Sequence, residues 1–139
     1  MSKRRLSLAV LAVLLLGATT GVRSEPAASG DPALAARVQT IVMRYSEALK
    51  AGDCRGLERL LAPPAFETYR TLCEQNTEYP RFLRDFYRNA SFWTSDVQPD
   101  GSRVRCTLHI QTAEGETSQA MLILERHRGR KWRIARIDS

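Results

Sequence analysis

The sequence predicts an α+β domain in which N-terminal helices pack on an antiparallel sheet of four strands or more. Three observations lead to this prediction. Apolar residues recur at helical spacing in residues 31–87. From Ala90 onward they alternate with polar residues, and three turn signals divide this alternating part into four segments. With 139 residues, the chain is long enough for one small domain and too short for two.

The first helix is the best defined element. Asp31 and Pro32 supply an N-cap and a proline in the first turn, and Gly52 marks the end. The inward residues of this first helix recur at helical spacing: Val38, Ile41, Val42, Tyr45 and Leu49. Asp53 is placed to cap a second, short helix.

The region after the second helix is less clear. The pair Pro63 and Pro64 breaks the pattern, and residues 65–75 fit either a helix or a strand. A last helix is expected to begin at Thr77 or Glu78. Its apolar side is formed by Phe82, Leu83, Phe86 and Tyr87.

Four segments with two-residue alternation then follow: "ASFWTSDVQ", "SRVRCTLHIQT", "TSQAMLILERH" and "KWRIARIDS". The turns between them are "PDG", "AEGE" and "RGR", so each strand reverses onto the one before it. In the last segment Trp132 and Ile134 alternate with Lys131, Arg133 and Ala135. We interpret its charges as the solvated face of a protected edge strand rather than as a polyanion site.

The N-terminus has the layout of a secretory signal peptide. Lys3, Arg4 and Arg5 precede an uncharged apolar run over residues 6–18, and small and polar residues follow. We expect a signal peptide at residues 1–24, a flexible leader at 25–32 and the folded domain at 33–139. This organisation predicts an exported protein, periplasmic or secreted, with no stable membrane span after cleavage, because the run is shorter than a spanning helix.

The formal charge of +6 belongs largely to this segment. Residues 1–24 contain four of the 21 basic residues and none of the 15 acidic ones, so their removal leaves a charge of +2. Such a balance does not favour a nucleic-acid partner, which requires a strongly basic surface.

The three cysteines predict one disulfide and one buried thiol. Cys54 lies nine positions before Pro63, and Cys73 lies nine positions after Pro64. Two helices folded back at the prolines would bring these cysteines level, as a disulfide requires. Cys106 lies in phase with the apolar residues of its strand, which is typical of a core thiol. Three free cysteines remain the alternative.

Two segments, "MRYSEALKAGDCRGLERLLAP" and "GRKWRIARIDS", carry a resemblance to a known group. Over residues 33–138 the chain resembles the nuclear transport factor 2-like superfamily, and is most similar to its exported bacterial domains of unknown function. The resemblance implies a cone-like α+β fold with a curved sheet. The superfamily includes ketosteroid isomerases and polyketide cyclases, and one fold of this kind hosts many functions.

The resemblance also implies where a site would lie. In the isomerases a tyrosine eight residues before the aspartate of Gly-Asp donates a hydrogen bond to an oxyanion, and Tyr45 matches it. The position of the general base falls on Tyr69, with Glu67 two residues earlier, so we expect no catalytic residue. The aromatic residues of the cone instead predict a binding site for a small apolar ligand, formed by Tyr45, Tyr69, Phe86 and Trp93.

No metal or cofactor is expected. His109 and His127 are the only histidines, they are far apart in the sequence, and no ligand cluster accompanies them. The preferred function is therefore non-enzymatic binding of a small apolar ligand or of a protein partner. Two alternatives stay open: an isomerase or cyclase that uses Tyr45 and Glu67, and a structural homodimer or envelope-assembly module. The polar sheet face with Arg103, Arg105 and His109 would be the interface of that dimer.

Overall fold

The computed structural model describes residues 31–126 and 131–139, and it has the α+β architecture that the sequence predicts. The helices are α2 (Pro32–Ala51), α3 (Cys54–Leu60), α4 (Pro63–Gln75) and α5 (Tyr79–Tyr87). The strands are β1 (Ser91–Asp100), β2 (Arg103–Gln111), β3 (Thr117–Arg126) and β4 (Trp132–Asp138). The predicted signal peptide, most of the leader and His127 lie outside the described residues.

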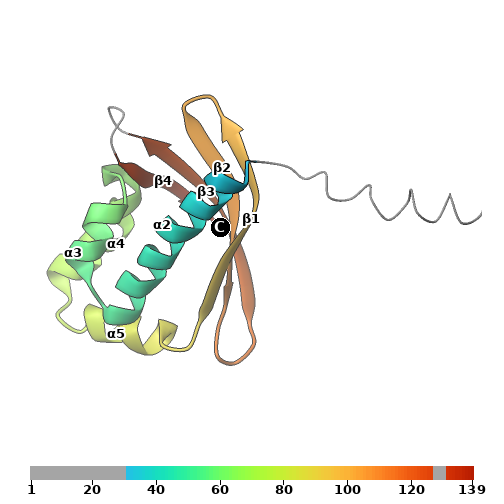
Figure 1. Cartoon of the computed structure of the whole chain (residues 1–139). Coiled ribbons are helices and arrows are strands. Elements are labelled where there is room, and N and C mark those ends of the chain that lie inside the picture. The colour runs from blue at the N-terminus through green and yellow to red at the C-terminus, as the bar shows by residue number, and fades with distance from the viewer. Residues whose placement is uncertain (1–30, 127–130) are drawn as a thin grey trace, which may run out of the picture.

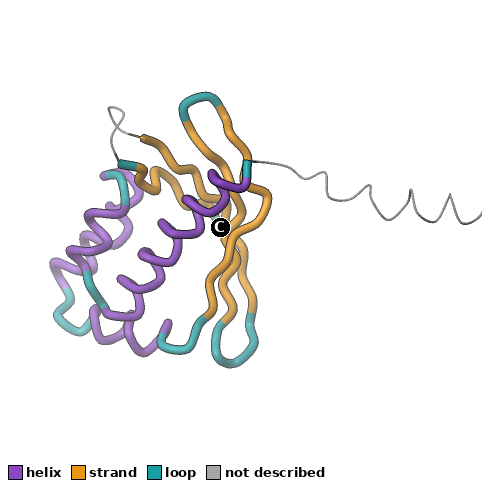
Figure 2. Tube along the Cα trace, viewed as in Figure 1, coloured by secondary structure: helices purple, strands orange, loops and turns teal. Residues whose placement is uncertain are grey.

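The four strands form one antiparallel sheet in the order β1-β2-β3-β4, as the three turn signals predict. The register pairs Cys106 with Leu122 in the middle of the sheet. An irregularity between Ser95 and Gln98 bends β1, and Asp96 there has a φ of 53°. Figures 1 and 2 show the helices on one face of the curved sheet, with α2 lying across it.

The hydrophobic core lies between this inner sheet face and the four helices. Side chains that are almost fully buried come from both layers: Val42, Leu49, Leu57, Leu83, Leu108, Leu122, Leu124 and Ile134. On β2 the buried residues alternate with exposed arginines, so the outer face of the sheet faces solvent. Among the described residues, no helix is both long and apolar enough to cross a lipid bilayer.

The ends of α2 are fixed by the residues that the sequence singles out. The Asp31 side chain accepts a hydrogen bond from the Ala33 N–H at 2.9 Å, and Pro32 occupies the first turn. Gly52 closes the helix in the left-handed region with a φ of 63°. A Cβ at this position would lie 2.3 Å from the Pro80 carbonyl oxygen, so glycine permits both the turn and the close approach of α5.

Residues 65–75, which fitted either a helix or a strand, are helical as part of α4. Pro63 and Pro64 follow the end of α3 and occupy the first turn of α4, where no N–H donor is needed.

The predicted disulfide is present: Cys54 of α3 and Cys73 of α4 are bonded, with their Cα atoms 6.3 Å apart. Cys106 is free and buried, and burial raises the pKa of its thiol to about 11.

One backbone contact attaches the helical layer to the last strand. Leu61, at the end of α3, forms a parallel bridge with Ile134 of β4. The Ala62 N–H donates to the Ile134 carbonyl at 2.8 Å. This bridge holds α3 beside β4.

Candidate functional site: a tyrosine pair and a basic groove

Two of the four predicted ligand-binding residues lie together. The hydroxyl oxygens of Tyr45 on α2 and Tyr69 on α4 are 2.6 Å apart and share a hydrogen bond. Tyr45 is 3% exposed and its ring packs edge-on against Phe92 of β1. The tyrosine pair is therefore part of the core, and Tyr69 is the member of the pair that lies nearer to solvent.

Burial sets the protonation of this pair. It raises the pKa of Tyr45 well above the ordinary value, and the nearby Tyr69 raises it further. Burial also raises the pKa of Tyr69 to about 12, although the hydrogen bond from Tyr45 works against this increase. Both hydroxyls are therefore neutral donors at physiological pH.

Phe86 and Trp93 lie on two other surfaces. Phe86 on α5 is 52% exposed and stacks on Phe82, so half of the predicted apolar side of α5 faces solvent. Trp93 lies on the outer sheet face, where its ring stacks on His109 with a centroid distance of 5.2 Å. The structure thus joins Tyr45 to Tyr69 and places Phe86 and Trp93 apart from them.

Glu67, the alternative base, does not reach the tyrosine pair through a hydrogen bond in the described structure. Its carboxylate binds Arg70 on the exposed side of α4. Tyr69 does line a cavity of about 480 Å³ together with the end of β4, including Arg136, Ile137 and Asp138. This cavity lies beside the tyrosine pair but contains no carboxylate from Glu67.

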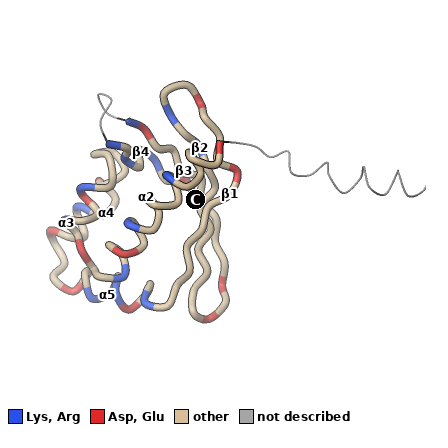
Figure 3. The backbone as a smooth tube through the Cα atoms, viewed as in Figure 1, with Lys and Arg blue, Asp and Glu red and all other residues tan. Residues whose placement is uncertain are grey.

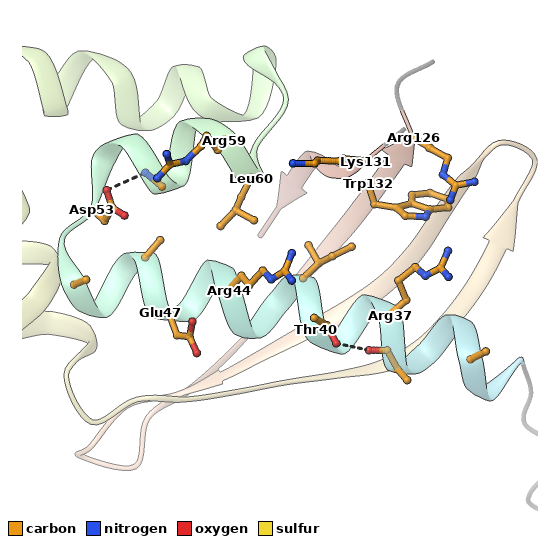
Figure 4. Close-up of a pocket in the computed structure, with 16 residues that line it drawn as sticks. Arg37, Thr40, Arg44, Glu47, Asp53, Arg59, Leu60, Arg126, Lys131 and Trp132 are labelled. Atoms are coloured by element: carbon orange, nitrogen blue, oxygen red, sulfur yellow. Dashed lines mark hydrogen bonds between the residues drawn. The ribbon is translucent and has the colours of Figure 1, made fainter. Parts of the chain in front are cut away.

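A larger cavity lies on the other side of α2. It is an open groove of about 1010 Å³ between α2, α3 and the ends of β3 and β4. Figure 4 shows α2 as one wall and α3 with the start of β4 as the opposite wall. We call this cavity the basic groove.

The basic groove is open because α2 presents small side chains to it. Ala33, Ala36, Ala48 and Ala51 all line it, and each leaves space that a larger residue would fill. Apolar contact surface is supplied by Ile41 and by Leu60, which packs against the core. A volume of this order is typical of small-molecule sites.

Positive charge surrounds this apolar surface. Five cationic side chains and two carboxylates line the groove: Arg37, Arg44, Arg59, Arg126 and Lys131, with Glu47 and Asp53. Figure 3 shows basic positions along α2 and where β3 ends and β4 begins. Within residues 31–126 and 131–139, none of the five cations pairs with a carboxylate. The groove thus has an excess of positive charge that a negatively charged ligand could neutralise.

Trp132 forms one end of the groove. The Arg126 guanidinium lies over its ring, 5.4 Å from the centroid, and the two residues are paired across β3 and β4. The indole Nε1 is buried and has no hydrogen-bond partner among the described residues. In Figure 4, Lys131 extends from the residue before β4 toward Leu60, and Arg37 and Arg44 extend from α2.

The sequence pattern did not predict this groove. It placed Lys131 on a solvated strand face, whereas Lys131 precedes β4 and lines the groove. One available signal was the series Ala33, Ala36, Arg37, Thr40 and Arg44, which marks a second, non-core face of α2 with small and basic residues. Arg133 and Arg136, by contrast, are exposed, as the strand pattern predicts.

Comparisons with known proteins show the fold. One solved structure, described as a conserved protein from Planctomyces limnophilus DSM 3776, has a TM-score of 0.54 and 18% identity, and the match covers 74% of this chain and 91% of that one. A variant of the designed protein Rd1NTF2_05 also has a TM-score of 0.54, with 15% identity over 71% of this chain and 92% of that one. No protein-family model matches the chain, and no curated protein matches it.

These likenesses and the order of elements define a nuclear transport factor 2-like fold, as the resemblance implies. At identities below one in five they show the fold alone. The activity has to be argued from the site itself.

Proposed function

We propose that this protein is a small-ligand-binding domain whose site is the basic groove, and that its ligand combines apolar surface with negative charge. The observation that carries the proposal is the composition of this one cavity. Its apolar surface is bordered by five cationic side chains that have no carboxylate partner within the described residues.

This proposal places the ligand in the groove rather than among the four predicted aromatic residues. Tyr45 is enclosed in the core, and Phe86 and Trp93 lie on separate surfaces. The isomerase or cyclase alternative has less support. A neutral Tyr45 hydroxyl could stabilise an oxyanion, but Glu67 binds Arg70 instead of facing the tyrosine pair.

The ligand test compares two matched charge removals. We expect the double variant R44Q/R59Q to lose affinity for amphipathic anions, because both arginines line the groove. The control R105Q/R133Q removes two exposed arginines that do not line the groove, one on β2 and one on β4, and should bind as the wild type does. Binding should weaken as salt is raised from 0.05 to 0.5 M, on the order of a several-fold change, because exposed charges are screened. Equal affinity of all three proteins in calorimetric titration would refute the groove as the site.

We also propose that the protein is exported. The support is the N-terminal pattern of basic residues, apolar run and small residues, together with the disulfide between Cys54 and Cys73. Expression in a bacterial host should place a shortened chain with an intact disulfide in the periplasmic fraction. Native mass spectrometry of that fraction measures the cleavage site and any ligand retained from the host. A full-length, reduced chain confined to the cytoplasm would contradict export.

A further inference from the structure

We infer that the ligand is a single-headed anionic amphiphile, whose oxyanion group binds Trp132 Nε1 and whose hydrocarbon part lies toward Leu60. The inference rests on the proposed function and adds the class and orientation of the ligand. An unsatisfied donor, the charges along the groove and the length of the groove support it.

The unsatisfied donor is the indole N–H of Trp132. Its nitrogen is buried and has no partner among the described residues. A buried donor without an acceptor destabilises the fold, so tryptophan nitrogens in such positions usually find a partner. An oxyanion in the groove would supply the missing acceptor once Arg126, which covers the indole ring, turns aside.

The charges next to Trp132 suit an anion. Arg126 lies over the indole ring with its guanidinium carbon 5.4 Å from the centroid, and it is exposed, so it can turn toward a ligand. Arg37 reaches from α2 toward the same end of the groove in Figure 4. Two guanidinium groups and one indole N–H would then surround the head group and form charge-assisted hydrogen bonds with it.

The opposite end of the groove carries charges of both signs. Glu47 and Asp53 lie there, on the last turns of α2 and at the N-cap of α3, together with Arg59 of α3 (Figure 4). An oxygen of Asp53 already accepts from the Gly56 N–H at 2.9 Å. A second anionic group would face these carboxylates, which is why the ligand should carry its charge at one end only.

The middle of the groove suits a hydrocarbon chain. Ile41, Ala48 and Leu60 supply its apolar surface. Arg44 and Lys131 border this surface, and both are exposed, so their long stems can cover a chain while their charged ends stay in solvent. The helical rise places Arg37 and Glu47 about 15 Å apart along α2. An extended dodecyl chain has a similar length, and burial of each of its methylenes favours binding.

The experiment uses three dodecyl probes that differ in their head groups: dodecanoate, dodecyl phosphate and dodecyltrimethylammonium. The protein carries W93F, so that Trp132 is its only tryptophan and its emission reports on the head-group end. We expect both anions to bind and to change Trp132 emission, and the cation to bind at least about tenfold more weakly. The ratio of the two anion affinities tells whether a carboxylate or a phosphate head is preferred.

Two substitutions separate the inference from the proposed function. W132F keeps an aromatic ring and removes the donor, and it should weaken anion binding about tenfold in calorimetry. R37Q should do the same, and because Arg37 is exposed this variant should fold even if W132F does not. The control R105Q should leave the affinity unchanged.

The outcomes are distinct. Anion binding that R44Q/R59Q weakens but W132F and R37Q do not would overturn the head-group assignment and leave the groove as the site. Binding of the cationic probe as tight as that of the anions, or no binding of any probe, would overturn the proposed function as well.

Discussion

At the scale of single residues, the tyrosine pair shows how strongly the surroundings decide what a hydroxyl contributes. Tyr45 and Tyr69 share one hydrogen bond of 2.6 Å, yet only Tyr45 is fully enclosed. If Tyr69 loses its hydroxyl, that of Tyr45 is left buried without a partner. If Tyr45 loses its hydroxyl, that of Tyr69 can still reach water.

We therefore predict unequal effects of two conservative substitutions. Y69F should lower the free energy of unfolding by about 1–3 kcal/mol, and Y45F by a smaller amount of about 0.5–1.5 kcal/mol. The double variant Y45F/Y69F should be more stable than the sum of the two losses implies, because no hydroxyl is left without a partner. Urea unfolding measures all three, and strictly additive losses would mean that the hydroxyls do not interact.

The same pair predicts a loss of stability in alkali. The pKa of Tyr69 is raised to about 12 in the folded protein, above the ordinary value of 10.0. The unfolded chain therefore releases the proton first, so this contribution is complete below pH 10 and is lost as the pH rises toward 12. Unfolding of wild type and of Y45F/Y69F at pH 9, 10 and 11 should diverge. The wild type should lose stability faster, and parallel curves would contradict the assignment.

At the scale of elements, two devices hold the helices in place: the close approach of α2 to α5 and the disulfide between α3 and α4. The first depends on Gly52, where a Cβ would lie 2.3 Å from the Pro80 carbonyl oxygen. Gly101 offers a matched comparison. It has a φ of 64°, but no atom lies within 4 Å of its Cβ position.

We predict that G52A destabilises the protein more than G101A does. Both substitutions force alanine into a left-handed conformation, which costs about 1 kcal/mol. Only G52A also pushes α5 away from α2, so it should lose at least about 1–2 kcal/mol more. Thermal unfolding of the two variants measures the difference, and equal losses would mean that α5 can move aside without cost.

The disulfide has a separate and additive role. Cys54 and Cys73 are 19 residues apart, and closing a loop of that length contributes about 3 kcal/mol in the chain-entropy model. The variant C54A/C73A should lose about that amount in urea unfolding. Reductant should destabilise the wild type similarly and leave C54A/C73A unchanged. A further loss in the variant on adding reductant would show that reductant acts elsewhere.

The elements also show what local sequence can and cannot predict. Both ends of α2 were predictable, because Asp31, Pro32 and Gly52 act on the backbone next to them. The secondary structure of residues 65–75 was not predictable, because Pro63 and Pro64 are compatible both with the end of one helix and with the first turn of the next. The sequence pattern also predicted which residues form the apolar side of α5. It did not predict that two of them, Phe82 and Phe86, remain half exposed.

At the scale of the whole molecule, the fold was predictable and the groove was not. The meander follows from turns between neighbouring strands, which are local signals. The groove joins Arg37 and Arg44 to Lys131 and Trp132, which are about ninety positions further along the chain. The parallel bridge between Leu61 and Ile134 joins the α3 and β4 parts of one wall, and no local pattern predicts that contact.

The sheet face remains a predicted homodimer interface. Trp93 is 40% exposed there, and Met121 and Ile123 on the same face of β3 are half-buried. We expect the wild type to sediment as a dimer and W93E to sediment as a monomer, because a charge would face the partner subunit. F86E places the same charge on α5 and should leave the dimer intact. A monomeric wild type, or a dimer lost only in F86E, would contradict a sheet-face interface.

The buried thiol in the middle of the sheet has a consequence for measuring the motions of this protein. Cys106 is 2% exposed, and its thiol has a pKa of about 11, so an alkylating reagent can reach a reactive sulfur only when β2 separates from its neighbours. The other two cysteines are held in the disulfide. The alkylation rate near neutral pH therefore counts openings of the central strands in the unmodified protein. A ligand that binds the groove without altering the sheet would leave that rate unchanged, whereas one that tightens the whole fold would slow it.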